Sequence, residues 1–269
     1  MRTMKLRGLA PAALILWLVA GSSSAQMPAD ALFRGFELNG DFIFELDGQD
    51  LASAEIYSSE RAAAYLIMAP ELSSPVLINP RAGAAESVHL MKVAKRPDGS
   101  IDLLADATFN RLSPLQIQGT EVHFDVKGVP AKLKPKPPLL GFHNSEDLKS
   151  YKPEYGRLSR AYKPAAAQIE TLKSADAARV LVYFGTWCPT CGRLVPRVMR
   201  VEEELRGSKL EFQYYGLEQG FENNPMAKAD DIHGVPTGIV YVNDREVGRL
   251  EAGDLNNPEA ALARLLGDG

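Results

Sequence analysis

The chain is poor in the residues that build metal centres and disulfide frameworks, with only 2 cysteines and 4 histidines among 269 residues. The cysteines are Cys188 and Cys191, so none remains for a structural disulfide elsewhere. A zinc site needs about four ligands, and the sequence has neither a second cysteine pair nor an H-x₃₋₅-H spacing. Ordinary hydrophobic cores must therefore stabilise the fold.

A block of basic residues and a long apolar run are also missing. The formal net charge is -4 and the pI is near 5.7. Without a basic block, a nucleic-acid partner is not expected. The apolar segment at residues 9–20 is too short for a membrane span and is followed at once by small polar residues.

The N-terminus predicts export. Arg2, Lys5 and Arg7 precede the apolar segment, and the small residues 21–25 follow it. This order is typical of a cleaved secretory signal peptide at residues 1–25, with a retained anchor as the alternative. We therefore expect a periplasmic protein. Roughly 240 residues remain after cleavage, which is enough for two cores.

Residues 28–131 predict a small β domain, an antiparallel sandwich or barrel. Apolar segments rich in β-branched and aromatic residues alternate with turn formers, and residues 96–99 (R-P-D-G) predict a hairpin. The predicted strands are residues 41–46, 54–57, 64–68, 75–78, 87–93, 100–104 and 121–127. His89 and His123 are expected on polar strand faces, with a shared metal site as the alternative. The role of this domain is unknown, and recognition or spacing is expected.

A linker is predicted at residues 132–150, ahead of a second domain at residues 151–269. Three prolines and three lysines interleave at residues 131–138, which favours an extended connection that neither helix nor sheet can absorb. Beyond it the pattern alternates between helix and strand, which predicts a mixed sheet covered by helices. Helices are expected at residues 163–172, 188–205, 224–232 and 258–266, and strands at 178–184, 210–215, 238–242 and 246–250.

The cysteine pair lies where a strand passes into a helix. Cys188 would occupy the helix N-terminus, where unpaired N–H groups and the helix dipole stabilise a thiolate. Cys191 would lie within one turn, close enough to resolve a mixed disulfide, and Pro189 suits a first helical turn. A structural disulfide across so short a loop would remove little chain entropy. Redox chemistry is therefore the favoured interpretation.

With these residues in place, the region from Tyr151 to Gly269 resembles a thioredoxin domain. The matching features are the W-C-x-x-C motif at Trp187 to Cys191, Pro196 in the helix, a cis-proline loop at residues 234–237, and Gly248 and Gly253 near the final hairpin. The resemblance implies a thiol:disulfide oxidoreductase. It covers a little under half of the chain.

The resemblance also implies roles for individual residues. Cys188 attacks as the thiolate and Cys191 resolves, forming the redox-active disulfide, while Trp187, Val235 and Pro236 bind substrate. No cofactor is needed. The implied partners are protein disulfides or dithiols and a membrane electron donor of the DsbD/CcdA type. Reduction of disulfides is expected, and oxidation of dithiols would use the same residues.

Two observations refine the resemblance. The buried Asp usual in thioredoxins is replaced by Val182, so Glu218 and Asp231 become candidates for the proton acceptor of Cys191. The Cys-Pro-Thr-Cys sequence, with residues 252–256, is similar to the DsbE/CcmG-type reductases of cytochrome c maturation. The chain lacks the insertion that those proteins carry before the cis-proline.

A binding protein or chaperone is the alternative from a different class. Two thiolates suit copper(I), and His233 could serve as a third ligand. The oligomeric state does not follow from the sequence.

Overall fold

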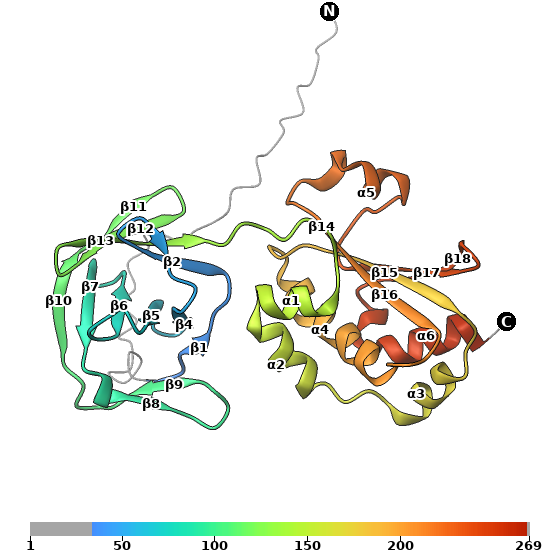
Figure 1. Cartoon of the computed structure of the whole chain (residues 1–269), viewed down its shortest axis with the longest axis horizontal. Helices are drawn as coiled ribbons and strands as arrows, with labels where there is room; N and C mark the ends of the chain where they lie inside the picture. Colours follow the sequence, from blue (N-terminus) through green and yellow to red (C-terminus); the bar gives the residue numbers. More distant parts are fainter. Residues whose placement is uncertain (1–33, 268–269) are drawn as a thin grey trace, which may run out of the picture.

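The computed structural model describes residues 34–267 of the chain. A β domain on the N-terminal side lies beside a mixed α/β domain on the C-terminal side (Figure 1). The expected signal peptide, residues 1–25, lies outside the described residues. No helix between residues 34 and 267 is long and apolar enough to cross a membrane.

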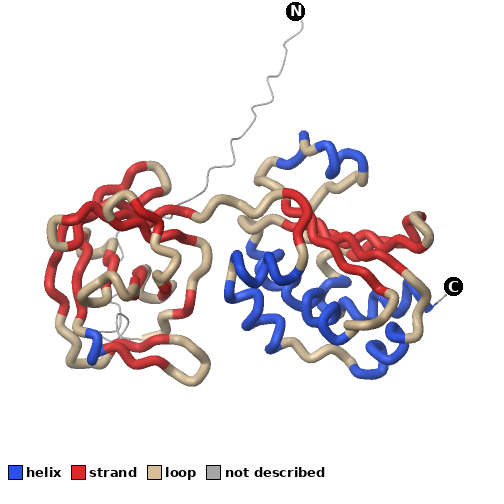
Figure 2. Tube along the Cα trace, in the orientation of Figure 1, coloured by secondary structure: helices blue, strands red, loops and turns tan. Residues whose placement is uncertain are grey.

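Three antiparallel sheets make up the β domain (Figure 2). A six-stranded sheet has the order β1-β4-β5-β6-β7-β10, a five-stranded sheet has the order β11-β12-β13-β2-β3, and β8 and β9 form a hairpin. The strands are β1 (Glu37–Leu38), β2 (Phe42–Leu46), β3 (Gln49–Asp50), β4 (Glu55–Ser59), β5 (Ala64–Met68), β6 (Val76–Asn79), β7 (Ala84–Val88), β8 (Val93–Lys95), β9 (Ile101–Leu103), β10 (Phe109–Pro114), β11 (Gln116–Gln118), β12 (Glu121–Val126) and β13 (Val129–Pro135).

Strand β5 shows how both faces of the six-stranded sheet are buried. Leu66 packs in one cluster with Ile101 of β9, whereas the next residue, Ile67, packs in another with Phe44 of β2 and Phe124 of β12. Successive strand residues point to opposite faces, so the five-stranded sheet covers one face and the β8–β9 hairpin covers the other. Of the two expected architectures, this face-to-face packing is that of a sandwich.

The predicted strand at residues 87–93 is wrong. β7 ends at Val88, and a 3₁₀ helix, η2 (Leu90–Lys92), separates it from β8. His89 caps this helix, because its Nδ1 accepts the N–H of Met91 at 3.2 Å. A side chain that bonds to the backbone in this way competes with a sheet ladder. The hairpin turn expected after β8 is confirmed by the pairing of β8 with β9.

The two histidines of the β domain do not form the shared metal site considered above. His123 lies on β12 with its Nε2 3.0 Å from the Glu121 carboxylate. His89 caps η2, which lies outside the five-stranded sheet that contains β12. Across residues 34–267, no group of three His, Cys, Asp or Glu side chains is placed to hold a metal ion.

The start of the predicted linker is a strand instead. Residues up to Pro135 belong to β13, which pairs with β12 on one side and β2 on the other. Apolar and lysine side chains alternate along it: Ala131 and Leu133 are buried, and the lysines after each of them reach the Glu45 carboxylate at 3.1 and 2.8 Å. This period-two pattern outweighs the prolines, because Pro135 stands at the strand end.

The end of the predicted linker belongs to the α/β domain. β14 (Gly141–His143) pairs with β16 (Leu210–Gly216), and a capping box at Asn144 begins α1 (Ser145–Tyr151). Leu148 of α1 is fully buried in the core of this domain. The domain therefore begins at β14 and not at residue 151.

The α/β domain has a five-stranded mixed sheet of order β14-β16-β15-β17-β18. Its core clusters place α1, α2, α3, α4 and α6 on one face and α5 on the other (Figure 1). The predicted elements are confirmed, with shifts at their ends. They are α3 (Ala166–Lys173), β15 (Ala178–Phe184), α4 (Pro189–Glu204), β16, α5 (Pro225–Ala229), β17 (Thr237–Val242), β18 (Arg245–Leu250) and α6 (Pro258–Gly267). The helix α2 (Pro153–Ala161) and the 3₁₀ turns η3 (Phe221–Asn223) and η4 (Asp254–Asn256) were not predicted.

Replacing Leu148 tests whether the predicted linker contributes to the core. Leu148→Ala should lower the free energy of unfolding of the α/β domain by about 2–5 kcal/mol, because it leaves a cavity in a packed core. Denaturant unfolding followed by the fluorescence of Trp187 measures the change. The matched control is Leu140→Ala, at a position that is 50% exposed, which should stay within about 0.5 kcal/mol of the wild type. Equal effects of the two substitutions would contradict the placement of α1 in the core.

Candidate active site

The loop after β15 brings the first cysteine to the N-terminus of α4. Cys188 is the N-cap residue, and Pro189 is the first residue of the helix. The backbone N–H of Cys191 points to Cys188 Sγ at 3.4 Å, so the thiol takes the place of the oxygen that usually caps a helix. This is the position predicted from the sequence. Because Cys188 is also partly exposed, a substrate disulfide can reach it.

Cys191 lies one turn inside α4 and is fully buried. The backbone N–H of Gly185 points to its Sγ at 3.5 Å. Burial raises the pKa of the Cys191 thiol well above its usual range. Both cysteines are free thiols in the structure. The pair therefore combines an accessible nucleophile with a thiol that keeps its proton.

The loop before β17 forms a second side of the site. The peptide bond between Val235 and Pro236 is cis, and the Val235 carbonyl oxygen lies 3.5 Å from Cys188 Sγ. The Thr237 hydroxyl donates a hydrogen bond to the Gly234 carbonyl at 2.9 Å, which fixes the loop. The predicted substrate loop and the predicted nucleophile thus lie together. An extended peptide can pair with backbone in such a place.

Trp187 forms a third side of the site and is 37% exposed. Its Nε1 donates to the Leu217 carbonyl at 2.8 Å, and its ring stacks on Phe221 with 6.5 Å between centroids. Gly185 lies beneath the ring, where a Cβ would stand 2.5 Å from indole atoms. Sequence reasoning missed both Phe221 and Gly185. The glycine two residues before Trp187 was a signal that could have revealed a close approach.

The expected substitutes for the buried Asp are exposed and lie outside the core cluster that holds Cys191. Val182 is fully buried in the same core cluster as Cys191, so β15 presents an aliphatic side chain there. Glu218 is exposed. The Asp231 carboxylate is 78% exposed and lies 3.1 Å from Nε2 of His233. Both candidate carboxylates are therefore exposed, whereas the Cys191 thiol that they were expected to serve is fully buried.

The three-ligand copper site is also not assembled. The His233 side chain is 84% exposed and is engaged with Asp231. Within the described part of the chain, no cluster unites three potential metal ligands. The copper alternative therefore loses its third ligand.

Helix α2 supplies a neighbour of Cys191 that the sequence did not reveal. Tyr155 is 1% exposed and belongs to the same core cluster as Cys191. Burial is the main cause that raises the pKa of the Tyr155 phenol. Its hydroxyl has no hydrogen-bond partner among residues 34–267. No motif marks this tyrosine, because its position depends on the packing of α2 against α4.

A cleft of about 600 Å³ separates the two domains next to the site. Glu154, Tyr155 and Gly192, the residue after Cys191, line it from the α/β domain, and Glu37 and Ser59 are among the residues that line it from the β domain. Figure 1 shows α2 on the side of the α/β domain that faces β1. The cysteine helix therefore borders the domain interface.

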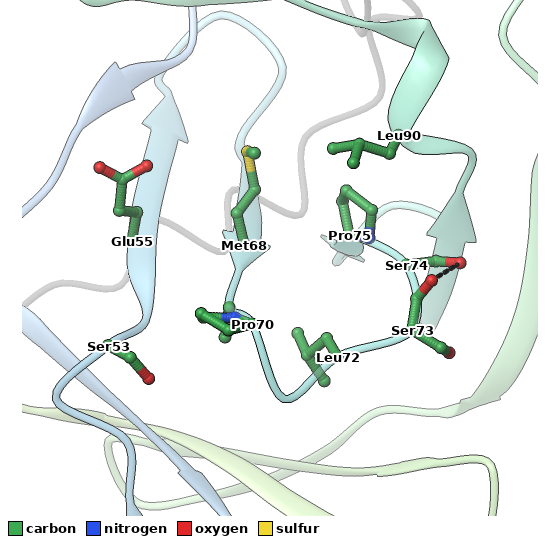
Figure 3. A pocket seen from close by; sticks show the side chains of 10 residues that line it. Ser53, Glu55, Met68, Pro70, Leu72, Ser73, Ser74, Pro75 and Leu90 are labelled. Atoms are coloured by element: carbon green, nitrogen blue, oxygen red, sulfur yellow. Dashed lines mark hydrogen bonds between the residues drawn. The ribbon is translucent and has the colours of Figure 1, made fainter.

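A second cavity, of about 380 Å³, lies within the β domain (Figure 3). Glu55, Met68, Pro75 and Leu90 are among the side chains around it. Its lining holds no cysteine and no histidine. The redox chemistry of the described residues is therefore confined to the α/β domain.

Comparison with known proteins agrees with this geometry. Residues 160–266 match the Thioredoxin family model. Thioredoxin-2 of Saccharomyces cerevisiae is 27% identical over 88 residues, which make up 33% of this chain and 80% of the yeast protein. The structure of thioredoxin f from spinach chloroplast is 21% identical, with a TM-score of 0.27, and the match covers 38% of this chain and 96% of that one. The structure of thioredoxin from Trypanosoma brucei brucei is 15% identical, with a TM-score of 0.25. The match covers 39% of this chain and 86% of the trypanosome protein.

The difference in burial between the thiols predicts their order of reaction. Iodoacetamide at pH 7 should label Cys188 at least about tenfold faster than Cys191, since only a thiolate reacts and burial disfavours that form at Cys191. Peptide mass spectrometry of the reduced protein measures both rates. Denatured protein, in which the rates should become similar, is the control. Faster labelling of Cys191 in the folded protein would reverse the assigned roles.

Proposed function

We propose that this protein, whose residues 160–266 form a thioredoxin domain with a C-x-x-C pair, is an exported reductase of protein disulfides in the bacterial periplasm. One observation carries the chemistry: the partly exposed Cys188 caps α4, and the buried Cys191 lies one turn behind it. Export rests on the sequence of residues 1–25, which is typical of a signal peptide.

The reaction begins with both cysteines reduced. The Cys188 thiolate attacks one sulfur of the substrate disulfide, a mixed disulfide forms, and the first substrate sulfur leaves as a thiolate. Cys191 then loses its proton and attacks Cys188 Sγ, which breaks the mixed disulfide and releases the second substrate sulfur. Two electrons pass from the dithiol to the substrate, and the Cys188–Cys191 disulfide remains.

The surroundings of Cys188 favour reduction over oxidation. A strong oxidase has a reduced form that is specially stabilised. In the part of the chain that the structure describes, Cys188 Sγ accepts a hydrogen bond from one backbone donor, the Cys191 N–H, and its thiol faces the Val235 carbonyl, which is an acceptor. We therefore propose that the protein reduces disulfides and does not oxidise dithiols.

A reductase must be reduced again after each turnover. Since each turnover leaves the Cys188–Cys191 pair as a disulfide, we propose a membrane donor of the DsbD/CcdA type. Apocytochrome c is a candidate substrate class, because the Cys-Pro-Thr-Cys sequence is similar to that of the DsbE/CcmG-type reductases. The β domain would contribute to recognition or assembly, and its residues take no part in the electron transfer.

The reduction potential tests the proposed direction. Equilibration of the full-length protein with glutathione buffers should give a potential nearer to about -270 mV, as in thioredoxin, than to about -120 mV, as in DsbA. Quantification of the oxidised fraction by thiol labelling and mass spectrometry measures it. A value near that of DsbA would make the protein an oxidase of dithiols.

Catalytic reduction of insulin tests the roles of the cysteines. Cys188→Ser should abolish turnover, because the nucleophile is lost, whereas Cys191→Ser should stop after the first step and accumulate a mixed disulfide with the substrate. Non-reducing mass spectrometry detects this adduct. Val247→Ala, at an exposed position on β18, is the control and should turn over at the wild-type rate. A mixed disulfide on Cys191 in the Cys188→Ser protein would contradict the mechanism.

A further inference from the structure

Resolution of the mixed disulfide requires Cys191 to lose a proton inside a closed core. Its Sγ is fully buried, and burial raises the pKa of this thiol. The position from which thioredoxins usually supply a carboxylate is occupied by Val182. The proton therefore needs another acceptor near α4.

Glu154 on α2 carries a buried carboxyl group, and its burial does not stabilise the fold because one oxygen is left without a partner among residues 34–267. The residue is 8% exposed, and its Oε1 accepts the backbone N–H of Gly40 from the β domain. Its Oε2 has no hydrogen-bond partner within the described part of the chain. An unpartnered buried oxygen costs about 1–3 kcal/mol. This oxygen is therefore available for a proton or a water molecule.

The interdomain cleft connects this carboxyl group with the cysteine helix. Glu154, Tyr155 and Gly192 line the same cleft. Tyr155 is packed in the Cys191 cluster, and its hydroxyl is likewise without a partner in residues 34–267. A hydroxyl can accept one proton while it donates another. Two polar groups without a partner among the described residues, the Tyr155 hydroxyl and Glu154 Oε2, thus belong to residues that line this cleft, and Tyr155 also shares the core cluster of Cys191.

Charged groups from both domains act on this route. Asp41 of the β domain and Lys152 at the start of α2 form an ion pair, and Lys136, at the connection, also acts on Glu154. Burial raises the pKa of Glu154, while the Gly40 N–H and Lys152 oppose this effect. Around Tyr155 lie Asp41, Tyr151 and the two cysteines, with Lys152 Nζ 5.9 Å from its ring centre. The remaining charged residues of the cleft are Arg34, Glu37, Glu60, Arg61 and Arg157.

We propose that Glu154 accepts the proton of Cys191 and that the Tyr155 hydroxyl relays it through the interdomain cleft. This inference rests on the proposed thiol:disulfide exchange. When Cys191 attacks, its S–H bond breaks, Tyr155 takes that proton and gives its own, directly or through cleft water, to the Glu154 carboxylate. The new bond joins Cys191 Sγ to Cys188 Sγ, and the substrate thiolate leaves. Neither residue touches the substrate.

The β domain takes part in this arrangement through Gly40. A Cβ at Gly40 would stand 2.8 Å from Glu154 Oε2 and 3.3 Å from the backbone of Lys152. The close approach of this loop to α2 holds the carboxyl group out of bulk water. Proton transfer in the α/β domain therefore depends on a residue more than 100 positions away in the sequence, since Gly40 and Glu154 are 114 residues apart.

A two-phase assay separates this inference from the proposed function. Reduced full-length protein is mixed with one equivalent of dithiobis(nitrobenzoate), and absorbance follows the release of thionitrobenzoate. The first equivalent reports the attack by Cys188, and the second reports resolution by Cys191. Glu154→Gln should leave the first phase unchanged and slow the second about 100-fold at pH 7, the lower end of what a positioned general base contributes.

The pH profile supplies a readout that a structural role would not move. In the wild type the second phase should fall as the pH drops through the raised pKa of Glu154, because a protonated carboxyl cannot accept a proton. In Glu154→Gln this inflection should vanish, and the rate should rise in proportion to hydroxide concentration. Tyr155→Phe keeps the packing, removes the relay hydroxyl, and should also slow only the second phase. Gly40→Ala should likewise slow only the second phase, because the added Cβ displaces Glu154.

Matched controls and contrary outcomes complete the test. Glu202 is another buried carboxyl group whose pKa burial raises, bonded to Tyr214 and Ser145 away from the cleft. Glu202→Gln and Tyr214→Phe should leave both phases and the pH profile unchanged. A second phase unaffected by both Glu154→Gln and Tyr155→Phe would overturn the proton route, as would equal slowing of both phases. Absence of the first phase in the wild type would instead overturn the proposed function.

Discussion

The pairing of β15 with β17 is the constraint on which the active site depends. The strands run antiparallel, with Tyr183 opposite Thr237. The loop that leaves β15 and the loop that enters β17 therefore meet at the same end of these two neighbouring strands. Cys188 belongs to the first loop and Val235 to the second. A slip of one residue would turn every side chain of β15 to the opposite face. The contact between Cys188 Sγ and the Val235 carbonyl is thus a result of sheet register.

The packing of α2 connects this site to the β domain. Its N-terminal part carries Lys152 and Glu154, which contact Asp41 and Gly40, while α2 as a whole packs on α4. An exposed ion pair contributes little to stability, about 0–1 kcal/mol. A buried carboxyl group that is only half satisfied has a cost instead. Stability therefore does not explain why Glu154 is buried at this interface.

The sequence predicted the parts of the fold that are governed by local periodicity. The apolar run at residues 178–184 and the turn at residues 96–99 correspond to β15 and the β8–β9 hairpin. Failures occurred where a local signal competed with packing. The prolines near Pro135 suggested a linker, but cross-strand pairing with β2 determined the outcome. His89 was assigned to a strand because a side-chain cap on a short 3₁₀ turn leaves no periodic pattern.

The candidate site divides in the same way. Cys188, Cys191 and their place at a helix start follow from a short motif, because a strand, a proline and two-residue spacing act within a few residues of each other. Glu218 and Asp231 were chosen by nearness in the chain, and nearness in the chain does not report distance in the fold.

The sequence by itself therefore determined the reactive pair and most of the segments that build each sheet. Only the tertiary structure decided which groups surround the buried thiol. Tyr155 shares the core cluster of Cys191 because α2 packs on α4, and Gly40 reaches Glu154 because the β domain docks there. Such contacts join residues that are far apart in the chain. Their energy comes from burial and hydrogen bonds formed on folding, which no local pattern encodes.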